Sequence, residues 1–253
     1  MNIVSLKKFY TRSGGGSVFN PAIIPGFYAG YVFPGNIIKG AFTDRCYGVH
    51  EATGNTDLDL LQSATLQTTA SRMPKLTFDT TIGKEVMTID GTEFSGQQSM
   101  YTINKFIPQP HAVAVVMKMN SDTNGKIFIQ NGGYSMYTSI EGDGVNRLKT
   151  QSAGFGGSTN QYVVGQWCII FAEIKLSKSY VMVNRLQRSS NETLTSVSNG
   201  TSLYIGGDAN GAAPQASYAE VWFYNNWSTT DYILKPYWEA FYNRINTLYS
   251  LKV

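Results

Sequence analysis

The acidic residues of this chain are poorly spaced for catalysis. Paired carboxylates can serve as general acid and nucleophile in glycoside hydrolysis, and alternate positions on a strand would bring two of them to one face. Glu85, Asp90 and Glu93 come nearest to this pattern, but their spacing is not alternate and Gly91 interrupts it. The acidic residues therefore indicate no glycosidase.

Other residues with catalytic potential stand alone. Glu173 and Glu220 are single acids in apparent strands, and we expect solvated, outward positions for both. His50 and His111 are the only histidines, and neither has a serine or cysteine elbow near it in the sequence. We therefore predict that the chain is not an enzyme.

One group of residues has the composition of a glycan site. Such a site needs an aromatic platform beside amide and carboxylate groups. The candidate residues are Tyr134, Tyr137, Asp143, Asn146, Phe155, Asp208 and Asn210. Packing in the core or at the rim of the sandwich would explain the aromatic residues among them equally well.

Strands must position these residues, and residues 202–233 show the pattern most clearly. Leu203 and Ile205 alternate with small or polar neighbours, as a half-buried strand requires. After a loop with an Asn-Gly turn signal, residues 219–224 alternate again, with 219, 221 and 223 on one face and 220, 222 and 224 on the other. Residues 111–119 form another strand, with Val113, Val115 and Met117 on one face.

This arrangement resembles the end of a laminin-G-like, concanavalin A-type jelly roll. The residues that carry the resemblance are Leu-Tyr-Ile-Gly at 203–206, Ala-Glu-Val-Trp-Phe-Tyr-Asn at 219–225 and Trp-Ser-Thr-Thr-Asp at 227–231. Gly165, Trp167 and the strand at 180–185 match further motifs of the family. The resemblance implies an all-β fold: a concanavalin A-like jelly-roll β-sandwich of two antiparallel sheets, with an N-terminal arm and a C-terminal helix.

Residues 25–91 resemble the opening of such modules in bacteriophage tail and other virion proteins. The Gly-Asn, Asp-Leu and Gln of residues 52–62 fall in the order of that pattern, although its tryptophan is missing. Some laminin-G-type domains bind calcium at the rim of the sandwich. We expect no cofactor, and the resemblance implies calcium binding as the alternative. The candidate calcium ligands are Asp122, Asp143 and Asp208, for which turn formation is the favoured role.

The chain divides into an arm and one domain. Residues 1–20 are predicted to form an assembly arm, in which Leu6, Phe9 and Tyr10 precede a triple-glycine break; a frayed terminus is the alternative. Residues 21–253 form the sandwich, with a helix over 229–249. A stripe on this helix is expected to pack across the sandwich, and an exposed oligomer seam is the alternative: Trp238, Phe241, Ile245 and Leu248.

The charge, the cysteine content and the apolar runs of the chain limit the classes of function that it can have. Only 15% of the residues are charged and the net charge is +3 with scattered basic residues, which argues against nucleic-acid binding. Cys46 and Cys168 are expected to be buried reduced thiols, with a bridge as the alternative. No signal peptide and no run of about 18 apolar residues is visible.

We therefore predict a non-enzymatic structural or adhesion protein on a bacteriophage virion: a tail fibre, baseplate or head-decoration component made in the host cytoplasm. Its partners would be other virion proteins through the arm, further copies of itself in a homo-oligomer, and host-surface glycans. No nucleic acid or membrane insertion is expected. The alternative is a bacterial carbohydrate-binding or adhesion module, and a weaker third alternative is a glycosidase with degenerate motifs.

Overall fold

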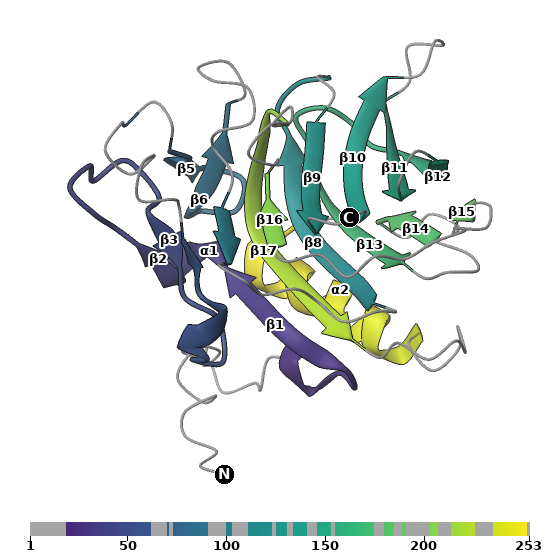
Figure 1. The fold of residues 1–253 in the computed structure, drawn as a ribbon, viewed down its shortest axis with the longest axis horizontal. Helices are drawn as coiled ribbons and strands as arrows, with labels where there is room; N and C mark the ends of the chain where they lie inside the picture. The colour runs from purple at the N-terminus through teal and green to yellow at the C-terminus, as the bar shows by residue number, and fades with distance from the viewer. Residues whose placement is uncertain are drawn as a thin grey trace.

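The computed structural model of the chain has two β-sheets and one long helix (Figure 1). It describes residues 19–61, 70, 73–90, 100–102, 111–122, 125–130, 134–140, 146–152, 155–174, 180–184, 189–190, 203–206, 214–225 and 235–251. The arm residues Leu6, Phe9 and Tyr10 lie outside this part of the chain.

Most elements are short strands, as the frequent turn signals indicate. The helical elements are η2 (Pro21–Ile23), α1 (Phe33–Asn36), η3 (Thr56–Leu58) and α2 (Lys235–Tyr249). The strands are β1 (Phe27–Val32), β2 (Ile37–Ile38), β3 (Gly48–Val49), β4 (Leu60–Leu61), β5 (Lys75–Asp79), β6 (Lys84–Ile89), β7 (Met100–Thr102), β8 (His111–Met119), β9 (Gly125–Gln130), β10 (Tyr134–Ile140), β11 (Asn146–Ser152), β12 (Phe155–Gln161), β13 (Trp167–Ile174), β14 (Tyr180–Val183), β15 (Ser189–Ser190), β16 (Leu203–Ile205) and β17 (Ala216–Asn225).

The strands form two antiparallel sheets. The eight-stranded sheet has the order β15-β14-β13-β8-β17-β6-β5, and β1 also pairs with β17. The nine-stranded sheet has the order β12-β11-β10-β9-β16-β7-β4-β3-β2. Strands distant in sequence are neighbours in both sheets, so the chain crosses between them repeatedly. The expected all-β sandwich of two antiparallel sheets is confirmed.

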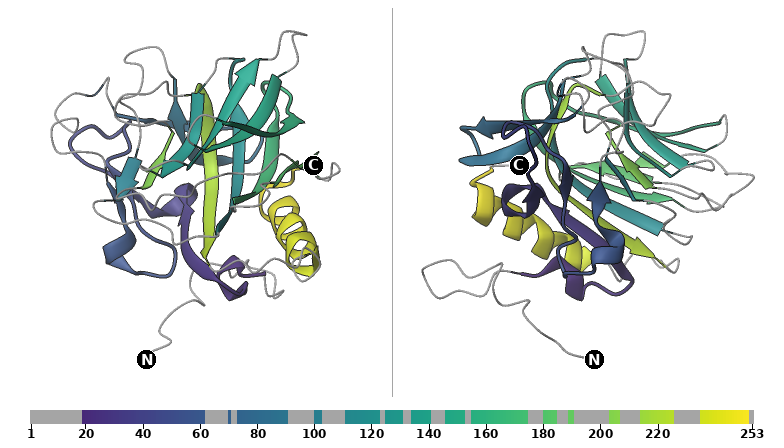
Figure 2. Two further views of the ribbon diagram at one scale, coloured as in Figure 1. Left: turned by 45° about the vertical axis from the view of Figure 1, so that its right-hand side comes forward. Right: turned by 60° about the vertical axis from the view of Figure 1, so that its left-hand side comes forward.

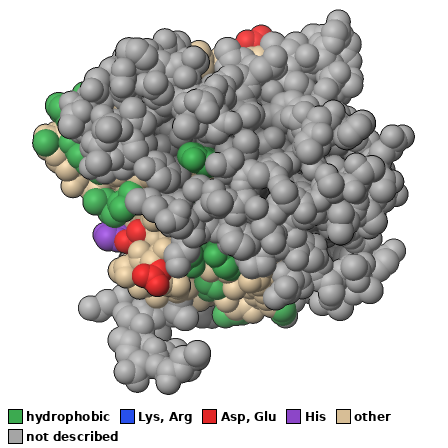
Figure 3. All heavy atoms as spheres, viewed as in Figure 1, with side chains coloured by type: hydrophobic (Ala, Val, Ile, Leu, Met, Phe, Trp, Pro, Cys, Tyr) green, Lys and Arg blue, Asp and Glu red, His purple; other side chains and the backbone are tan. Residues whose placement is uncertain are grey.

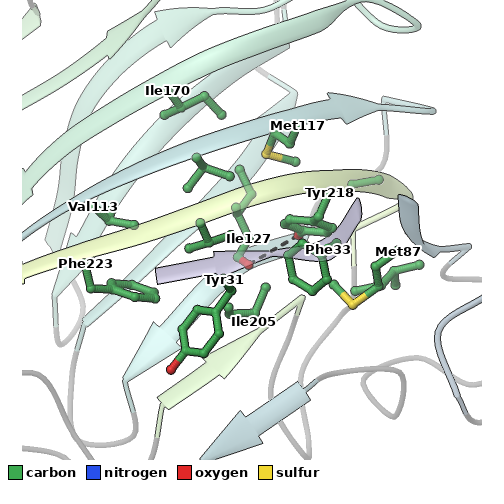
Figure 4. Packing of buried hydrophobic residues seen from close by; sticks show 14 of the residues in the cluster. Tyr31, Phe33, Met87, Val113, Met117, Ile127, Ile170, Ile205, Tyr218 and Phe223 are labelled. Carbon is green, nitrogen blue, oxygen red and sulfur yellow. Dashed lines mark hydrogen bonds between the residues drawn. The ribbon is translucent and has the colours of Figure 1, made fainter. Parts of the chain in front are cut away.

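The core lies on both faces of the central strands of the eight-stranded sheet. On β8, Val113, Val115 and Met117 belong to the cluster between the two sheets, which Figure 4 shows from close by. Ala114 and Val116 face the other way, into a second buried cluster on the outer face. The predicted alternation of this strand is confirmed, and both of its faces are buried.

The strand β17 departs from simple alternation at one position. Val221 and Phe223 join the inner cluster and Trp222 joins the outer one, as expected. Ala219, however, packs in the outer cluster, because a β-bulge between Tyr218 and Glu220 interrupts the pairing with β8. The bulge puts two consecutive residues on one face, which a period of two does not predict.

The helix α2 covers the outer face of the eight-stranded sheet, on the side away from the nine-stranded sheet (Figure 2). Phe241 and Ile245 are buried there, and Trp238 and Leu248 pack at the edges of the same cluster. The expected packing of this stripe across the sandwich is confirmed. Within the predicted range of 229–249, the helix occupies Lys235–Tyr249, and residues 229–234 lie outside the described part.

The expectation of a solvated Glu220 is wrong. The residue is fully buried under α2, where its Oε2 accepts hydrogen bonds from Arg244 Nη1 at 2.6 Å and Trp222 Nε1 at 2.7 Å. Its Oε1 accepts a hydrogen bond from the hydroxyl of Tyr249. Glu220 points outward from the sheet, but the helix covers this face and supplies the cation.

Three further features of the sequence can be compared with the structure. Cys46 and Cys168 are buried free thiols, as predicted. Trp167 is buried, and its Nε1 donates to Asp79 Oδ1 at 3.1 Å. Among the described residues, no helix combines the length and apolar character that a membrane span requires.

Candidate glycan-binding face

The outer face of the nine-stranded sheet contrasts with the helix-covered face on the other side of the sandwich. In β16, Leu203 and Ile205 are buried in the core between the sheets, whereas Tyr204 is only partly buried. Because side chains alternate along a strand, Tyr204 lies on the outer face. Antiparallel sheets commonly have one solvated face of this kind.

Cross-strand pairing extends from Tyr204 across the entire sheet. Each residue in the row is the direct partner of the next, so all of these positions belong to the same face. This cross-strand row consists of Ile38, Gly48, Leu61, Tyr101, Tyr204, Ile129, Ser135, Gln151 and Gly156. It combines apolar and aromatic positions with hydroxyl and amide positions.

The end of the row at β2, β3 and β4 is apolar and partly exposed to solvent. Leu61 is 38% exposed, although it is a large hydrophobic residue. A Cβ atom added to Gly48 would lie 2.9 Å from Leu61 Cδ2 and 3.2 Å from Ile38 Cδ1. The glycine therefore lets the two aliphatic side chains approach each other over the backbone of β3.

A histidine–carboxylate pair continues this end of the face. His50 and Asp59 follow β3 and precede β4, two positions along from Gly48 and Leu61, and so lie on the same face. His50 Nδ1 is 2.8 Å from Asp59 Oδ2, and the histidine side chain is 59% exposed. Figure 3 shows a histidine beside acidic and hydrophobic side chains on this side of the molecule. If Asp59 accepts from Nδ1–H, the neutral imidazole presents Nε2 as an acceptor.

The loop 50–59, which joins β3 to β4, is braced by a buried carboxylate. Glu51 is 2% exposed, and its Oε1 accepts from Gly30 N of β1 at 3.0 Å. Its Oε2 accepts from the backbone N and Oγ1 of Thr53, at 2.7 and 2.5 Å, and from Asn55 N at 3.3 Å. The exposed hydroxyl, amide and carboxylate side chains of 53–57 are therefore presented on a fixed backbone.

Sequence patterns did not single out this part of the face. The Gly-Asn and Asp-Leu pairs of 52–62 contributed to the family resemblance, but no binding role was expected there. Glu51 meets Gly30 across 21 residues of sequence, and His50 meets Asp59 across nine. Alternation within β3 and β4 would have put His50 and Asp59 on one face, but each strand has only two residues, too few to recognise.

The structure brings some of the sequence-predicted glycan residues together and separates others. The position of Tyr134 pairs with Ser152, which pairs with Phe155, so Tyr134 and Phe155 share one row. Asn146 pairs with Ile140, six residues or about 20 Å farther along β10.

Tyr137 belongs to neither of these two rows. It lies two positions from Ser135, a member of the cross-strand row, and so belongs to the outer-face set of positions. The structure does not describe the side chains of Tyr134, Tyr137, Asn146 and Phe155, and Asp143, Asp208 and Asn210 lie outside the described residues. The glycan-binding role of these seven residues stays a prediction.

The acidic residues show no metal or catalytic cluster in the described part of the chain. Asp122 is exposed, while Asp143 and Asp208 lie outside this part, and no described group of three or more His, Cys, Asp or Glu could hold a metal ion. Glu85 and Asp90 alternate to opposite faces of the β6 segment and pair with Lys39 and Lys75, respectively. Those two carboxylates are therefore not a catalytic pair.

Comparisons with known proteins identify the fold. No protein-family model matches the chain, and no curated protein matches it. The structure of Trypanosoma rangeli sialidase superimposes with a TM-score of 0.53 at 8% identity, covering 94% of this chain and 35% of the sialidase. The complex of that sialidase with sialic acid gives a TM-score of 0.52 at 9% identity, again over 94% and 35%. The chain thus spans about a third of the length of these sialidases.

Two further structures match at TM-scores below 0.5. Domain 4 of the Geobacillus stearothermophilus arabinanase AbnA, in complex with arabinotriose, gives 0.45 at 16% identity, over 60% of this chain and 75% of that one. A pentraxin from Limulus polyphemus gives 0.39 at 18% identity, over 51% and 70%. The sialidase matches and the antiparallel two-sheet topology together show that the chain is a concanavalin A-like β-sandwich.

Proposed function

We propose that this chain is a non-catalytic carbohydrate-binding or adhesion module, and that it binds glycans on the outer face of the nine-stranded sheet. The observation that carries the proposal is the cross-strand row through Tyr204, which has the exposed imidazole of His50, held by Asp59, beside it. Sugars present apolar C–H faces and hydroxyl groups, and sites that bind them combine aromatic or aliphatic surface with a few fixed polar groups.

The geometry supports binding at low entropic cost. Tyr204 belongs to a strand paired on both sides, and the loop 50–59 is held by Glu51 through four hydrogen bonds. Preorganised groups lose little conformational freedom on binding, so weak individual contacts can contribute to affinity.

The absence of catalysis is part of the same proposal. It is supported by the separation of Glu85 from Asp90 and by the surroundings of His50. In the described part of the chain, the side-chain hydrogen bond of His50 is made with Asp59, and no described hydroxyl or thiol joins the pair as a nucleophile. Purified protein is expected to cleave no glycan in a broad polysaccharide panel.

The test is a glycan panel combined with two variants. His50→Ala removes an exposed side chain and Tyr204→Ala removes the ring at the centre of the row. Each is expected to weaken binding of the best-bound glycan about tenfold or more, equivalent to about 1.4 kcal/mol. Ile23→Ala is the matched control, because Ile23 is 61% exposed but precedes β1, outside the nine-stranded sheet. Equal affinities for all four proteins, or no glycan bound by the wild type, would refute the proposal.

A second, narrower candidate places the same module on a bacteriophage particle as a tail-fibre, baseplate or head-decoration component. The sequence pattern of residues 25–91 supports it, together with the apolar residues Leu6, Phe9 and Tyr10 ahead of the triple glycine. Deletion of residues 1–18, which keeps Phe19 on the outer cluster and Asn20 at the cap of η2, is then expected to preserve folding and glycan binding while abolishing incorporation into particles. Incorporation of the truncated protein at the normal level would exclude an assembly role for the arm.

A further inference from the structure

The β5–β6 hairpin carries an exposed aromatic ring with no structural role in the core. Phe78 is 62% exposed and is the only aromatic residue among the exposed large hydrophobic side chains of the described part of the chain. Single exposed hydrophobic residues are common on protein surfaces, so exposure alone does not indicate a site. The groups beside the ring provide the further argument.

The cross-strand partner of Phe78 is Glu85 on β6. Two positions earlier on β5, Leu76 N donates to Asp44 O and therefore points away from β6. The pair Leu76–Met87 is thus a non-hydrogen-bonded pair, and so is Phe78–Glu85 two residues farther on. Facing side chains are closest in pairs of this type, at about 4.5 Å between Cα atoms. The ring and the carboxylate are therefore direct neighbours on one face.

A cation completes the group. Lys39 Nζ, from the segment after β2, lies 3.0 Å from Glu85 Oε2, and the two side chains are 49% and 52% exposed. A flat apolar surface is thus bordered by a hydrogen-bond donor and an acceptor, which is the combination that a pyranose requires. The opposite charges of Lys39 and Glu85 neutralise each other, and an exposed neutral pair gives little attraction for a charged sugar.

Hydrogen bonds to the side chain of the residue next to Phe78 also hold the hairpin in place. Asp79 is buried, and its Oδ1 accepts from Thr81 N at 2.9 Å and from Ile82 N at 3.2 Å within the turn. The same carboxylate binds Trp167 Nε1 and Lys118 Nζ, which anchor the hairpin on the outer face of the eight-stranded sheet. A ring on a fixed hairpin pays little entropy when a ligand covers it.

We infer that Phe78, Glu85 and Lys39 form a second glycan site, which stacks the apolar face of a neutral pyranose on the ring and binds its hydroxyls through the ion pair. Phe78 and Glu85 lie on β5 and β6 at the edge of the eight-stranded sheet, away from the strands of the cross-strand row, and Lys39 follows Ile38 at the end of that row. The ligand class is the one assigned under the proposed function, but the ring and the carboxylate belong to strands outside the nine-stranded sheet.

The test is a titration with methyl β-D-glucopyranoside and methyl β-D-galactopyranoside, followed through backbone amide resonances. The amides of 77–85 are expected to shift with at least one of the two sugars. In Phe78→Ala the apparent Kd at this hairpin is expected to rise about tenfold or more, while the amides of 203–206 respond as in the wild type. Glu85→Gln and Ile23→Ala serve as controls for the ion pair and for loss of an exposed apolar side chain elsewhere; we expect a weaker site in the first and no change in the second.

Each outcome separates the two sites. Shifts at 203–206 without shifts at 77–85 would overturn the hairpin site and leave the proposed function intact, whereas shifts at 77–85 alone would support the hairpin site and argue against the sheet face. An unchanged hairpin response in Phe78→Ala would overturn the stacking role. Binding of methyl β-D-glucuronide, the carboxylate counterpart of the glucoside, at the hairpin as tightly as the neutral sugars would overturn the assignment of a neutral ligand.

Discussion

Removal of the buried Glu220 carboxylate should cost the domain a large part of its stability. Glu220 and Arg244 are both fully buried, and a 2.6 Å hydrogen bond between them links β17 to α2. The Arg244 guanidinium also lies 5.6 Å from the ring centre of Trp222. In Glu220→Ala the guanidinium would stay under the helix without its counter-charge.

The magnitude follows from the cost of an uncompensated buried charge. Loss of one partner of a buried ion pair typically destabilises a protein by about 3–5 kcal/mol. Arg244→Met should have an effect of similar size, because it leaves the carboxylate buried instead. The double variant Glu220→Ala/Arg244→Met removes both charges, and its methionine fills part of the space with apolar atoms. Loss of the carboxylate also leaves Trp222 and Tyr249 without their acceptor, which costs about 1–3 kcal/mol for each unsatisfied group. The double variant should nevertheless lose less stability than the sum of the losses in the two single variants.

The assay is urea unfolding followed by tryptophan fluorescence, with the midpoint and the slope fitted for all four proteins. We expect both single variants to shift the midpoint to lower urea and the double variant to show a favourable coupling of more than about 1 kcal/mol. Additive effects in the cycle would refute the pairing of these residues. A change of less than about 0.5 kcal/mol in Glu220→Ala, the size typical of a surface substitution, would show that α2 does not cover this position.

Two further predictions concern Asp79 and the two thiols. Burial alone would raise the pKa of Asp79, but hydrogen bonds from Lys118, Trp167 and Ile82 lower it overall. The carboxylate therefore stabilises the fold above its unfolded pKa of about 3.9, and this contribution is lost as the pH falls through the lower folded value. Asp79→Asn should reduce the urea midpoint at neutral pH, with a difference from wild type that shrinks below about pH 4; a difference independent of pH would contradict this. Burial raises the pKa of Cys46 and Cys168 to about 12, so neither thiol should react with a disulfide reagent at about pH 8 in the native protein, while both react after denaturation. Rapid labelling of the native protein would contradict their burial.

The parts of the fold that follow a regular period could be predicted from the sequence. Val113, Val115 and Met117 alternate on β8, and Phe241 and Ile245 repeat at helical spacing on α2. Such patterns show which side chains share a face, and the hydrophobic effect then requires those faces to be covered. They do not show which element covers a face.

Glu220 illustrates this limit. Its outward position on β17 follows from alternation, and an outward acid is normally solvated. Its partners Arg244 and Tyr249 come 24 and 29 residues later, on a helix whose docking site no local pattern specifies. The same holds for the candidate face: Glu51 and Gly30 are brought together by the fold alone.

The difference between the two sheets connects the fold to the proposed site. The central strand β8 is apolar on both faces, and each face is covered, one by the other sheet and one by α2. In β16 only Leu203 and Ile205 are buried, and in β4 Leu60 is buried while Leu61 is exposed. A strand that alternates in this way can leave one face in water without losing core contacts, whereas β8 cannot. In the described part of the chain, the proposed site therefore uses the outer face of the nine-stranded sheet, because the corresponding face of the eight-stranded sheet is needed to hold the helix.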